Sequence, residues 1–167
     1  MGKEHFTLAL FYCQGTPQSS EHDRQSLEER YGKAIRLFPI PCSGRLEPLH
    51  LLRALEEFAD AVYLITCPDG TCRYFDGNSR ARKRIERTRS IITSIGLEEE
   101  RVGILVRSKD DRRVLVDLVQ EIMDRVEGVA PSPVLNQAVK RAHAHSRNLE
   151  ASTLRSKATA EDGSPHV

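Results

Sequence analysis

The chain lacks several features that would place it in a class of protein at once. Its 167 residues include no tryptophan, and no apolar run approaches the roughly 18 residues of a membrane-spanning helix. The formal net charge is +1, so no overall field favours a nucleic acid as partner. The apolar run near the N-terminus is too short for a signal peptide. These absences predict a cytoplasmic protein with no membrane span.

The sequence also has few cysteines, and its fold does not need them as bridges. A chain of this length can bury one hydrophobic core without disulfides or metals, and cytoplasmic thiols stay reduced. The cysteines are Cys13, Cys42, Cys67 and Cys72. In that setting four thiols indicate metal or redox chemistry.

Short apolar segments alternate four times with segments of helical pattern. The predicted strands lie within 6–13, 33–42, 61–67 and 101–108, and the predicted helices within 19–32, 47–60, 78–96 and 110–128. This alternation predicts an α/β fold, a flavodoxin-like three-layer sandwich with a four-stranded parallel sheet. By analogy with flavodoxin-like sheets, we expect the strand order 2-1-3-4.

The apolar spacing also predicts which residues the second and third helices bury. These are Leu49, Leu52, Leu55 and Phe58 in the second helix, and Ala81, Ile85, Ile92 and Ile95 in the third. We expect one α/β domain over residues 1–130. Residues 131–167 form a polar tail that we expect to be partly helical or disordered.

All four cysteines fall at or just after the carboxyl ends of predicted strands. In a parallel sheet these ends meet at one edge, where open α/β sheets bind ligands. The simpler interpretation is four separate small residues buried at strand ends. Cys72 fits that interpretation poorly, because it follows the turn sequence "PDGT". We therefore expect the four thiols to form one site.

Four thiolates suit either a zinc ion or an iron–sulfur cluster. Structural zinc sites usually consist of two C-x(2–4)-C knuckles, whereas this chain has one C-x₄-C pair and two isolated cysteines. A [2Fe–2S] cluster also takes four thiolates, and C-x₄-C occurs in plant-type ferredoxins, although the C-x₂-C that follows there is absent here. Gly70 and Gly77 would let the backbone approach such a centre closely.

Residues 80–89, "RARKRIERTR", form a strongly basic run, and its arginines are expected to face outward. A solvated helix face and a docking surface explain the run equally well. Binding of nucleic acid is disfavoured, because the run contains no aromatic residue to stack on bases. A catalytic thiol pair of Cys67 and Cys72 is disfavoured too, because such pairs use C-x-x-C.

Two motifs taken together resemble a known family. "CSGRLEP" at 42–48 and "CPDGTCRYFDGNSRARKR" at 67–84 are similar to motifs of the delta (iron–sulfur) subunits of methyl-viologen-reducing hydrogenases. Those subunits carry C-S-G-R-[VL]-[DE]-P and then C-x-x-G-x-C-[HR]-Y-x-x-G-N. The similarity extends from about Leu8 to Leu105.

The resemblance implies a [2Fe–2S] cluster held by Cys13, Cys42, Cys67 and Cys72. It implies a non-catalytic electron carrier in an oxidoreductase complex. Its partners would be a hydrogenase, formate dehydrogenase or similar donor, and the flavin-containing subunit of a heterodisulfide reductase-like complex. The family usually has C-x-x-C at the first strand, whereas this chain has "CQGT" at 13–16. The alternative function is an α/β docking module with a structural four-cysteine zinc site.

Overall fold

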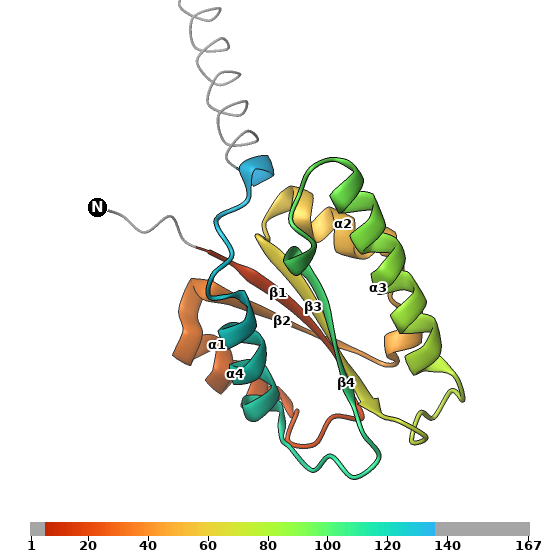
Figure 1. Ribbon diagram of the computed structural model, residues 1–167. Helices are drawn as coiled ribbons and strands as arrows, with labels where there is room; N and C mark the ends of the chain where they lie inside the picture. The colour runs from red at the N-terminus through yellow and green to blue at the C-terminus, as the bar shows by residue number, and fades with distance from the viewer. Residues whose placement is uncertain (1–5, 136–167) are drawn as a thin grey trace, which may run out of the picture. The chain divides into compact units, whose positions relative to one another are not determined.

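The computed structural model describes residues 6–135, and its centre is a four-stranded, all-parallel sheet (Figure 1). The strands are β1 (Leu8–Cys13), β2 (Ile35–Ile40), β3 (Ala61–Pro68) and β4 (Val102–Arg107). Their order in the sheet is β2-β1-β3-β4. The predicted α/β fold and strand order are both confirmed.

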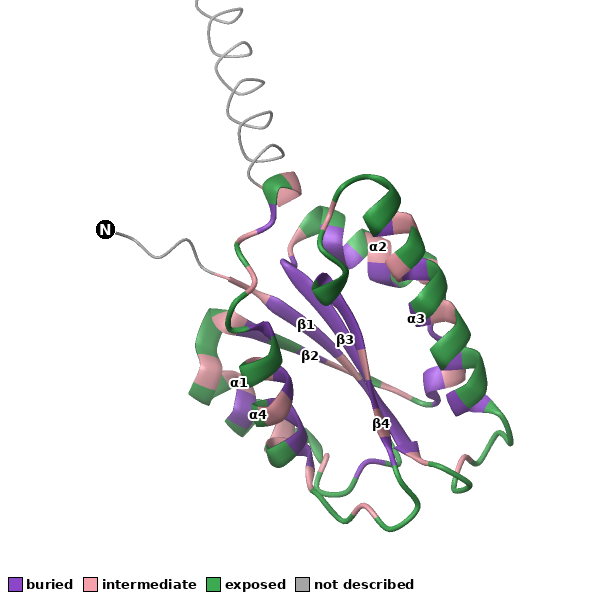
Figure 2. Cartoon of the chain, in the orientation of Figure 1, coloured by how far each residue is buried: buried purple, intermediate pink, exposed green. Residues whose placement is uncertain are grey.

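Helices cover both faces of the sheet and complete a three-layer sandwich (Figure 1). One face carries α1 (Glu21–Tyr31) and α4 (Leu115–Val126), and the other carries α2 (Pro48–Glu57) and α3 (Gly77–Ser94). The strands β1 and β3 are almost wholly buried between these layers, whereas the edge strand β2 buries only Ile35 and Leu37 (Figure 2). Since side chains alternate along a strand, Leu8 and Leu10 join the α4 core while Ala9 joins the α2–α3 core.

Local sequence explains where several of these helices begin and end. Ser20 caps α1: its hydroxyl accepts from the backbone amide of Asp23, whose carboxylate accepts from the amide of Ser20. The helix ends at Gly32, which has a φ of +57°. Pro48 opens α2, where its missing amide hydrogen costs nothing.

Two of the predicted buried faces need correction. Leu51, Ala54 and Leu55 are the buried residues of α2, whereas Leu49 is 56% exposed. The predicted apolar face and the buried face of this helix overlap. The contacts of α2 with β3 and α3 decide which of the two is buried. On α3 the predicted Ala81, Ile85 and Ile92 are buried, but Ile95 follows the last helical residue and is 68% exposed.

The fourth helix starts later than predicted, at Leu115 rather than near residue 110. The fully buried Arg107 causes this: its Nη2 donates to the carbonyl oxygens of Asp111 and Arg113, both at 2.9 Å. The carboxylate of Asp111 in turn accepts from the backbone amide of Arg113 at 2.9 Å. These bonds hold the segment in a loop.

At the amino edge of the sheet, one buried carboxylate joins two distant segments. Asp60 accepts from the backbone amide of Thr7 at 2.7 Å and from that of Ser132 at 2.5 Å. Arg101 donates to the carbonyl oxygen of Asp60 at 2.9 Å. Residues 129–132 are thereby fastened beside the start of β1.

The predicted boundary between a domain at 1–130 and a tail at 131–167 stays a prediction, since residues 136–167 lie outside the described part. None of the helices described at 6–135 is long and apolar enough to cross a membrane.

Candidate metal centre

The four cysteines line one cavity at the carboxyl edge of the sheet. Its volume is about 270 Å³, and its lining includes Cys13, Cys42, Cys67 and Cys72. Cys13 is the last residue of β1, and Cys67 lies close to the end of β3. Cys42 follows β2, and Cys72 lies in the loop after β3. The structure thus brings all four predicted site residues together, with their thiols unbridged.

The thiols lie close enough to influence one another. The sulfur atoms of Cys42 and Cys72 lie 3.9 Å apart. Interaction with Cys67 is the main cause that lowers the pKa of the Cys13 thiol, to about 6. The same interaction, together with burial and the nearby Cys72, raises the pKa of Cys67. Within residues 6–135, no three His, Cys, Asp or Glu side chains are placed to share a single metal ion.

Burial also raises the pKa of the Cys42 thiol. The protein without a bound metal therefore favours the thiolate at Cys13 and the neutral thiol at Cys42 and Cys67. Metals bind thiolates, so loading this site must displace protons.

Gly77, the first residue of α3, packs directly against one thiol pair. A Cβ at this position would lie 2.6 Å from the sulfur of Cys42 and 2.8 Å from that of Cys72. Gly44 is also constrained, because a Cβ there would lie 2.7 Å from the Cα of Gly77. The predicted close approach at Gly77 is confirmed, whereas Gly70 has open space around it and serves a turn at φ +77°.

The position of Gly77 directs the N-terminus of α3 at the Cys42–Cys72 pair. This helix has 18 residues, and no side chain caps its first turn. The positive end of a helix dipole stabilises negative charge. This end of the helix would therefore stabilise the negative charge of a metal centre held by this pair.

Asn78 connects the cysteine-bearing segments. Its Nδ2 donates to the carbonyl oxygen of Cys67 at 3.0 Å, and its Oδ1 accepts from the Cys67 thiol at 3.3 Å. The hydroxyl of Ser43, next to Cys42, donates to the same Oδ1 at 3.5 Å. Asn78 is itself only 8% exposed. It therefore fixes the position of Cys67 relative to the Cys42 loop.

A β-bulge carries Cys67. On β3 two residues separate Ile65 from Pro68, whereas on β4 one residue separates their partners, Leu105 and Arg107. Bulges re-aim side chains next to functional sites. The extra residue accounts for how Cys67 reaches both the cavity and Asn78.

Comparison with known proteins agrees with this arrangement. Residues 8–130 match the family model for the methyl-viologen-reducing hydrogenase delta subunit. The chain belongs to this family. The family model covers both cysteine motifs and all four strands, so the resemblance seen in the motifs is confirmed.

Individual relatives carry two kinds of name. The vhu iron-sulfur subunit of the F420-non-reducing hydrogenase of Methanocaldococcus jannaschii is 29% identical over 108 residues, which cover 65% of this chain and 81% of the relative. Its counterpart from Methanopyrus kandleri is 30% identical over 102 residues, covering 61% and 77%. One subunit of the ferredoxin/F420H2-dependent CoB-CoM heterodisulfide reductase of Methanosarcina acetivorans is 31% identical over 102 residues, covering 61% of this chain and 13% of that much longer protein.

Thr16 takes the place of the second cysteine in the C-x-x-C that the resemblance implies for the first-strand loop. The residue is buried, its hydroxyl has no hydrogen-bond partner, and it is outside the cavity lining. Cys13 is thus the one thiol that the first-strand loop contributes to the cavity.

The arginines of the basic run at 80–89 do not all face outward, although the sequence predicts that they do. Arg84 donates to the carbonyl oxygens of Gly44 and Leu46 and pairs with Glu47 at 2.6 Å, so it holds the Cys42 loop against α3. Arg89 donates to the carbonyl oxygen of Val102 at 2.7 Å. The expectation that the arginines face outward is wrong for these two.

The sequence analysis missed the roles of Asn78 and Arg84. Asn78 is the second residue of the "GN" pair in the family motif, but the motif does not indicate which groups its side-chain amide would bind. Arg84 gave no signal, because it stands among five other basic residues of the same run.

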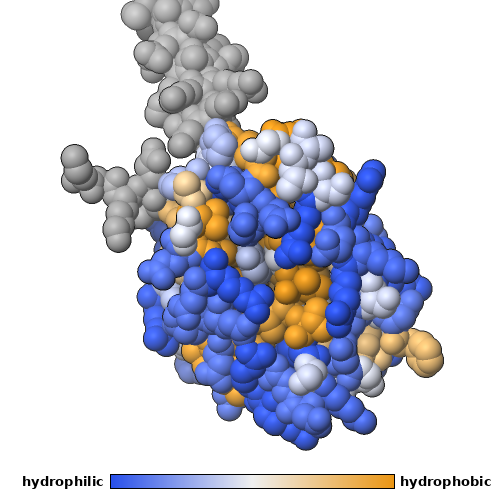
Figure 3. All heavy atoms as spheres, viewed as in Figure 1, coloured by the Kyte–Doolittle hydropathy of each residue, from blue (hydrophilic) through white to orange (hydrophobic). Residues whose placement is uncertain are grey.

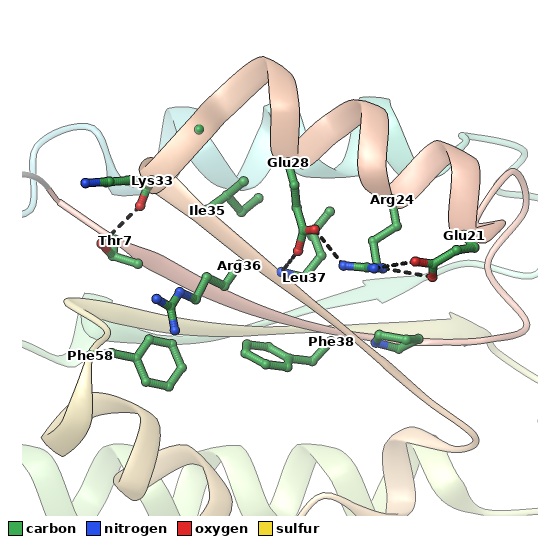
Figure 4. A pocket seen from close by; sticks show the side chains of 12 residues that line it. Thr7, Glu21, Arg24, Glu28, Lys33, Ile35, Arg36, Leu37, Phe38 and Phe58 are labelled. Atoms are coloured by element: carbon green, nitrogen blue, oxygen red, sulfur yellow. Dashed lines mark hydrogen bonds and ion pairs between the residues drawn. The ribbon is translucent and has the colours of Figure 1, made fainter.

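A larger cavity lies elsewhere in the described residues. It has a volume of about 850 Å³ and runs along the free edge of β2 (Figure 4). Arg24 pairs there with Glu21 and with Glu28, and Glu28 also accepts from the backbone amide of Leu37 at 3.1 Å. No cysteine lines it.

Proposed function

We propose that the chain is an electron-transfer protein that carries a [2Fe–2S] cluster on Cys13, Cys42, Cys67 and Cys72. The observation that carries this proposal is the gathering of four thiols around one cavity, with the sulfurs of Cys42 and Cys72 3.9 Å apart. A [2Fe–2S] cluster takes four thiolates, two on each iron. When bound, such a cluster accepts and releases a single electron.

The chain's own residues supply the rest of the site. Gly77 leaves room beside the Cys42–Cys72 pair, and the N-terminus of α3 offsets the negative charge of the thiolates. Asn78 orients Cys67 through its bonds to the thiol and the carbonyl. Three of the four cysteines are buried, so little water reaches the sulfur atoms. Such surroundings set the potential of a centre.

We further propose that electrons pass from a hydrogenase, formate dehydrogenase or similar donor to the flavin-containing subunit of a heterodisulfide reductase-like complex. The names of the relatives support this, since they include iron–sulfur subunits of hydrogenases and part of a heterodisulfide reductase. A region similar to this chain lies within that reductase polypeptide, and domains that work together are often joined in one polypeptide. The role is that of a carrier without its own catalysis.

A structural four-cysteine zinc site in a docking module is the second candidate. Two thiolates on one tetrahedral zinc lie about 3.8 Å apart, and the Cys42–Cys72 distance of 3.9 Å agrees with that value. The cysteine spacing fits zinc poorly, however, because the chain has one C-x₄-C pair and two isolated cysteines instead of two C-x(2–4)-C knuckles. The relatives named iron-sulfur subunits also favour the cluster.

The test is metal and sulfide analysis of the full chain purified without oxygen. We expect about two irons and two acid-labile sulfides per chain, with absorbance in the visible range. One zinc per chain, without iron or sulfide, would establish the alternative. Four free thiols with no metal would contradict both.

A further inference from the structure

The loop between β3 and α3 exposes an aromatic ring beside the cysteine site. Phe75 is 99% exposed, and its φ of +73° lies in the left-handed region that bulky side chains rarely adopt. Two backbone bonds hold this conformation, from Phe75 to the carbonyl oxygen of Cys72 at 3.1 Å and from Asp76 to that of Tyr74 at 2.9 Å. Packing within the described residues does not explain a strained backbone that presents a ring to solvent.

The ring is an apolar group on a mostly hydrophilic surface. In Figure 3 a small apolar protrusion rises from the hydrophilic surface at the lower right, over this loop. Tyr74 is 52% exposed and lines the thiol cavity, and Phe75 lines a neighbouring cavity together with Cys72. Cys72, three residues before Phe75, is the one cysteine that is not fully buried. The shortest route from the thiols to solvent therefore lies here.

Positive charge surrounds these aromatic residues. Arg73 lines the thiol cavity, and Arg45 and Arg80 line a small adjoining cavity with Cys42 and Tyr74. Arg82 lines another neighbouring cavity together with Cys72 and Phe75. The acidic residues here are Asp69, paired with Arg82 at 3.2 Å, and Asp76, paired with Arg80 at 2.9 Å. Arg45 and Arg73 are exposed, and no ion pair to either is found among the described residues.

We propose that this aromatic–basic face docks an acidic surface of the electron-transfer partner, with the ring of Phe75 inserted into an apolar recess. The face consists of Arg45, Arg73, Tyr74, Phe75, Arg80 and Arg82. This inference rests on the proposed function, because electrons must cross the surface close to the thiols. Aromatic and arginine side chains are enriched where protein interfaces gain most of their affinity. The excess of positive charge steers an acidic partner and sets its association rate.

The charge part of the proposal is tested with one haem acceptor in two charge states. The full chain, checked first for cluster content by absorbance, is reduced without oxygen and mixed with native cytochrome c, which is basic, or with succinylated cytochrome c, which is acidic. One electron leaves the reduced protein and converts one ferric haem to ferrous, with no bond or proton exchanged. We expect about tenfold faster reduction of the acidic form at low salt, and a ratio near one once salt screens the charges.

Substitutions then locate the effect. The double variant Arg73→Glu/Arg82→Glu should remove or reverse the preference for the acidic acceptor. The matched control is Arg30→Glu/Lys33→Glu, which makes the same change of net charge at two exposed residues, at and just beyond the end of α1, on the other face of the sheet. Equal rates with both acceptors in the unmodified protein, or an equal effect of the control variant, would overturn the proposal.

Phe75→Gly tests the aromatic part without harming the fold. Glycine adopts a positive φ freely, so the melting temperature should stay the same or rise. We expect unchanged absorbance but severalfold slower reduction of the acidic acceptor, whereas Ile95→Ser, which removes an exposed apolar side chain beyond the far end of α3, should have no effect. Transfer by Phe75→Gly at the unmodified rate would exclude the ring from docking. A chain that shows no cluster absorbance before mixing contradicts the proposed function instead, which separates the two failures.

Discussion

Two of the cavities in the described residues differ in size and in chemistry, and the smaller of the two is the candidate site. The cavity along β2 measures about 850 Å³, against about 270 Å³ for the thiol cavity. In the larger one both acidic side chains pair with Arg24, and Glu28 also accepts from the backbone amide of Leu37. The smaller one gathers thiols against a glycine that no other residue could replace without a clash. The thiols available as metal ligands, rather than the volume, distinguish the candidate cavity.

Removal of one buried thiol should have the largest effect on the iron and sulfide content. Cys67→Ala deletes the thiol that Asn78 positions, and we expect almost complete loss of iron and sulfide from the purified chain. Arg24→Ala, in the larger cavity, is the matched control and should keep the full content. A Cys67→Ala protein with unchanged iron would show that Cys67 is not a ligand.

The next largest effect is expected from Gly77→Ala. The added methyl group would overlap the sulfurs of Cys42 and Cys72, so cluster content should fall and the free energy of unfolding should decrease by about 1–3 kcal/mol. Gly128→Ala is the control, since a Cβ there meets no atom within 4 Å. Denaturant titration and iron analysis measure both effects. Equal behaviour of the two variants would mean that the thiol pair has room to move.

Cys13→Ser should have a smaller effect than Cys67→Ala. The serine oxygen can replace sulfur as an iron ligand, so we expect partial retention of the cluster with a shifted absorbance spectrum. The measurement is the ratio of visible to protein absorbance, with iron analysis. An unchanged content and spectrum would require a fourth ligand other than Cys13.

Asn78→Asp should leave the cluster in place and change its properties. The substitution keeps an acceptor for the Cys67 thiol but removes the donor to the Cys67 carbonyl, which should cost about 1–3 kcal/mol of stability. The new negative charge should lower the reduction potential measured by redox titration. Ser79→Asp, which adds the same charge at an exposed neighbour, is the control. An equal shift in both variants would exclude a positioning role for Asn78.

Glu28→Gln should have the smallest effect. It removes the charge that pairs with Arg24 in the larger cavity but keeps an oxygen for the amide of Leu37, so we expect a loss of at most about 1 kcal/mol. Cluster content and electron transfer should be unchanged. A loss of iron in this variant would contradict the assignment of the site to the smaller cavity.

Regular pattern made much of this structure predictable from sequence. Fourfold alternation indicated the α/β sheet, and parallel topology placed Cys13, Cys42 and Cys67 at one edge. The bulge at Cys67 and the bonds of Arg84 to the Cys42 loop could not be predicted, because both depend on contacts between segments that are distant in the chain. The prediction of the buried face of α2 was wrong for the same reason. Leu49 and Leu51 lie on overlapping apolar faces of the helix, and only tertiary packing decides which of them is buried.

The carboxylate of Asp60 has a consequence for how this domain can be attached to others. By holding Thr7 and Ser132, it brings both ends of the compact fold to the amino edge of the sheet, while the thiols occupy the carboxyl edge. A covalent connection made at residue 7 or 132 therefore begins away from the cysteines, and it uses no residue that lines the thiol cavity.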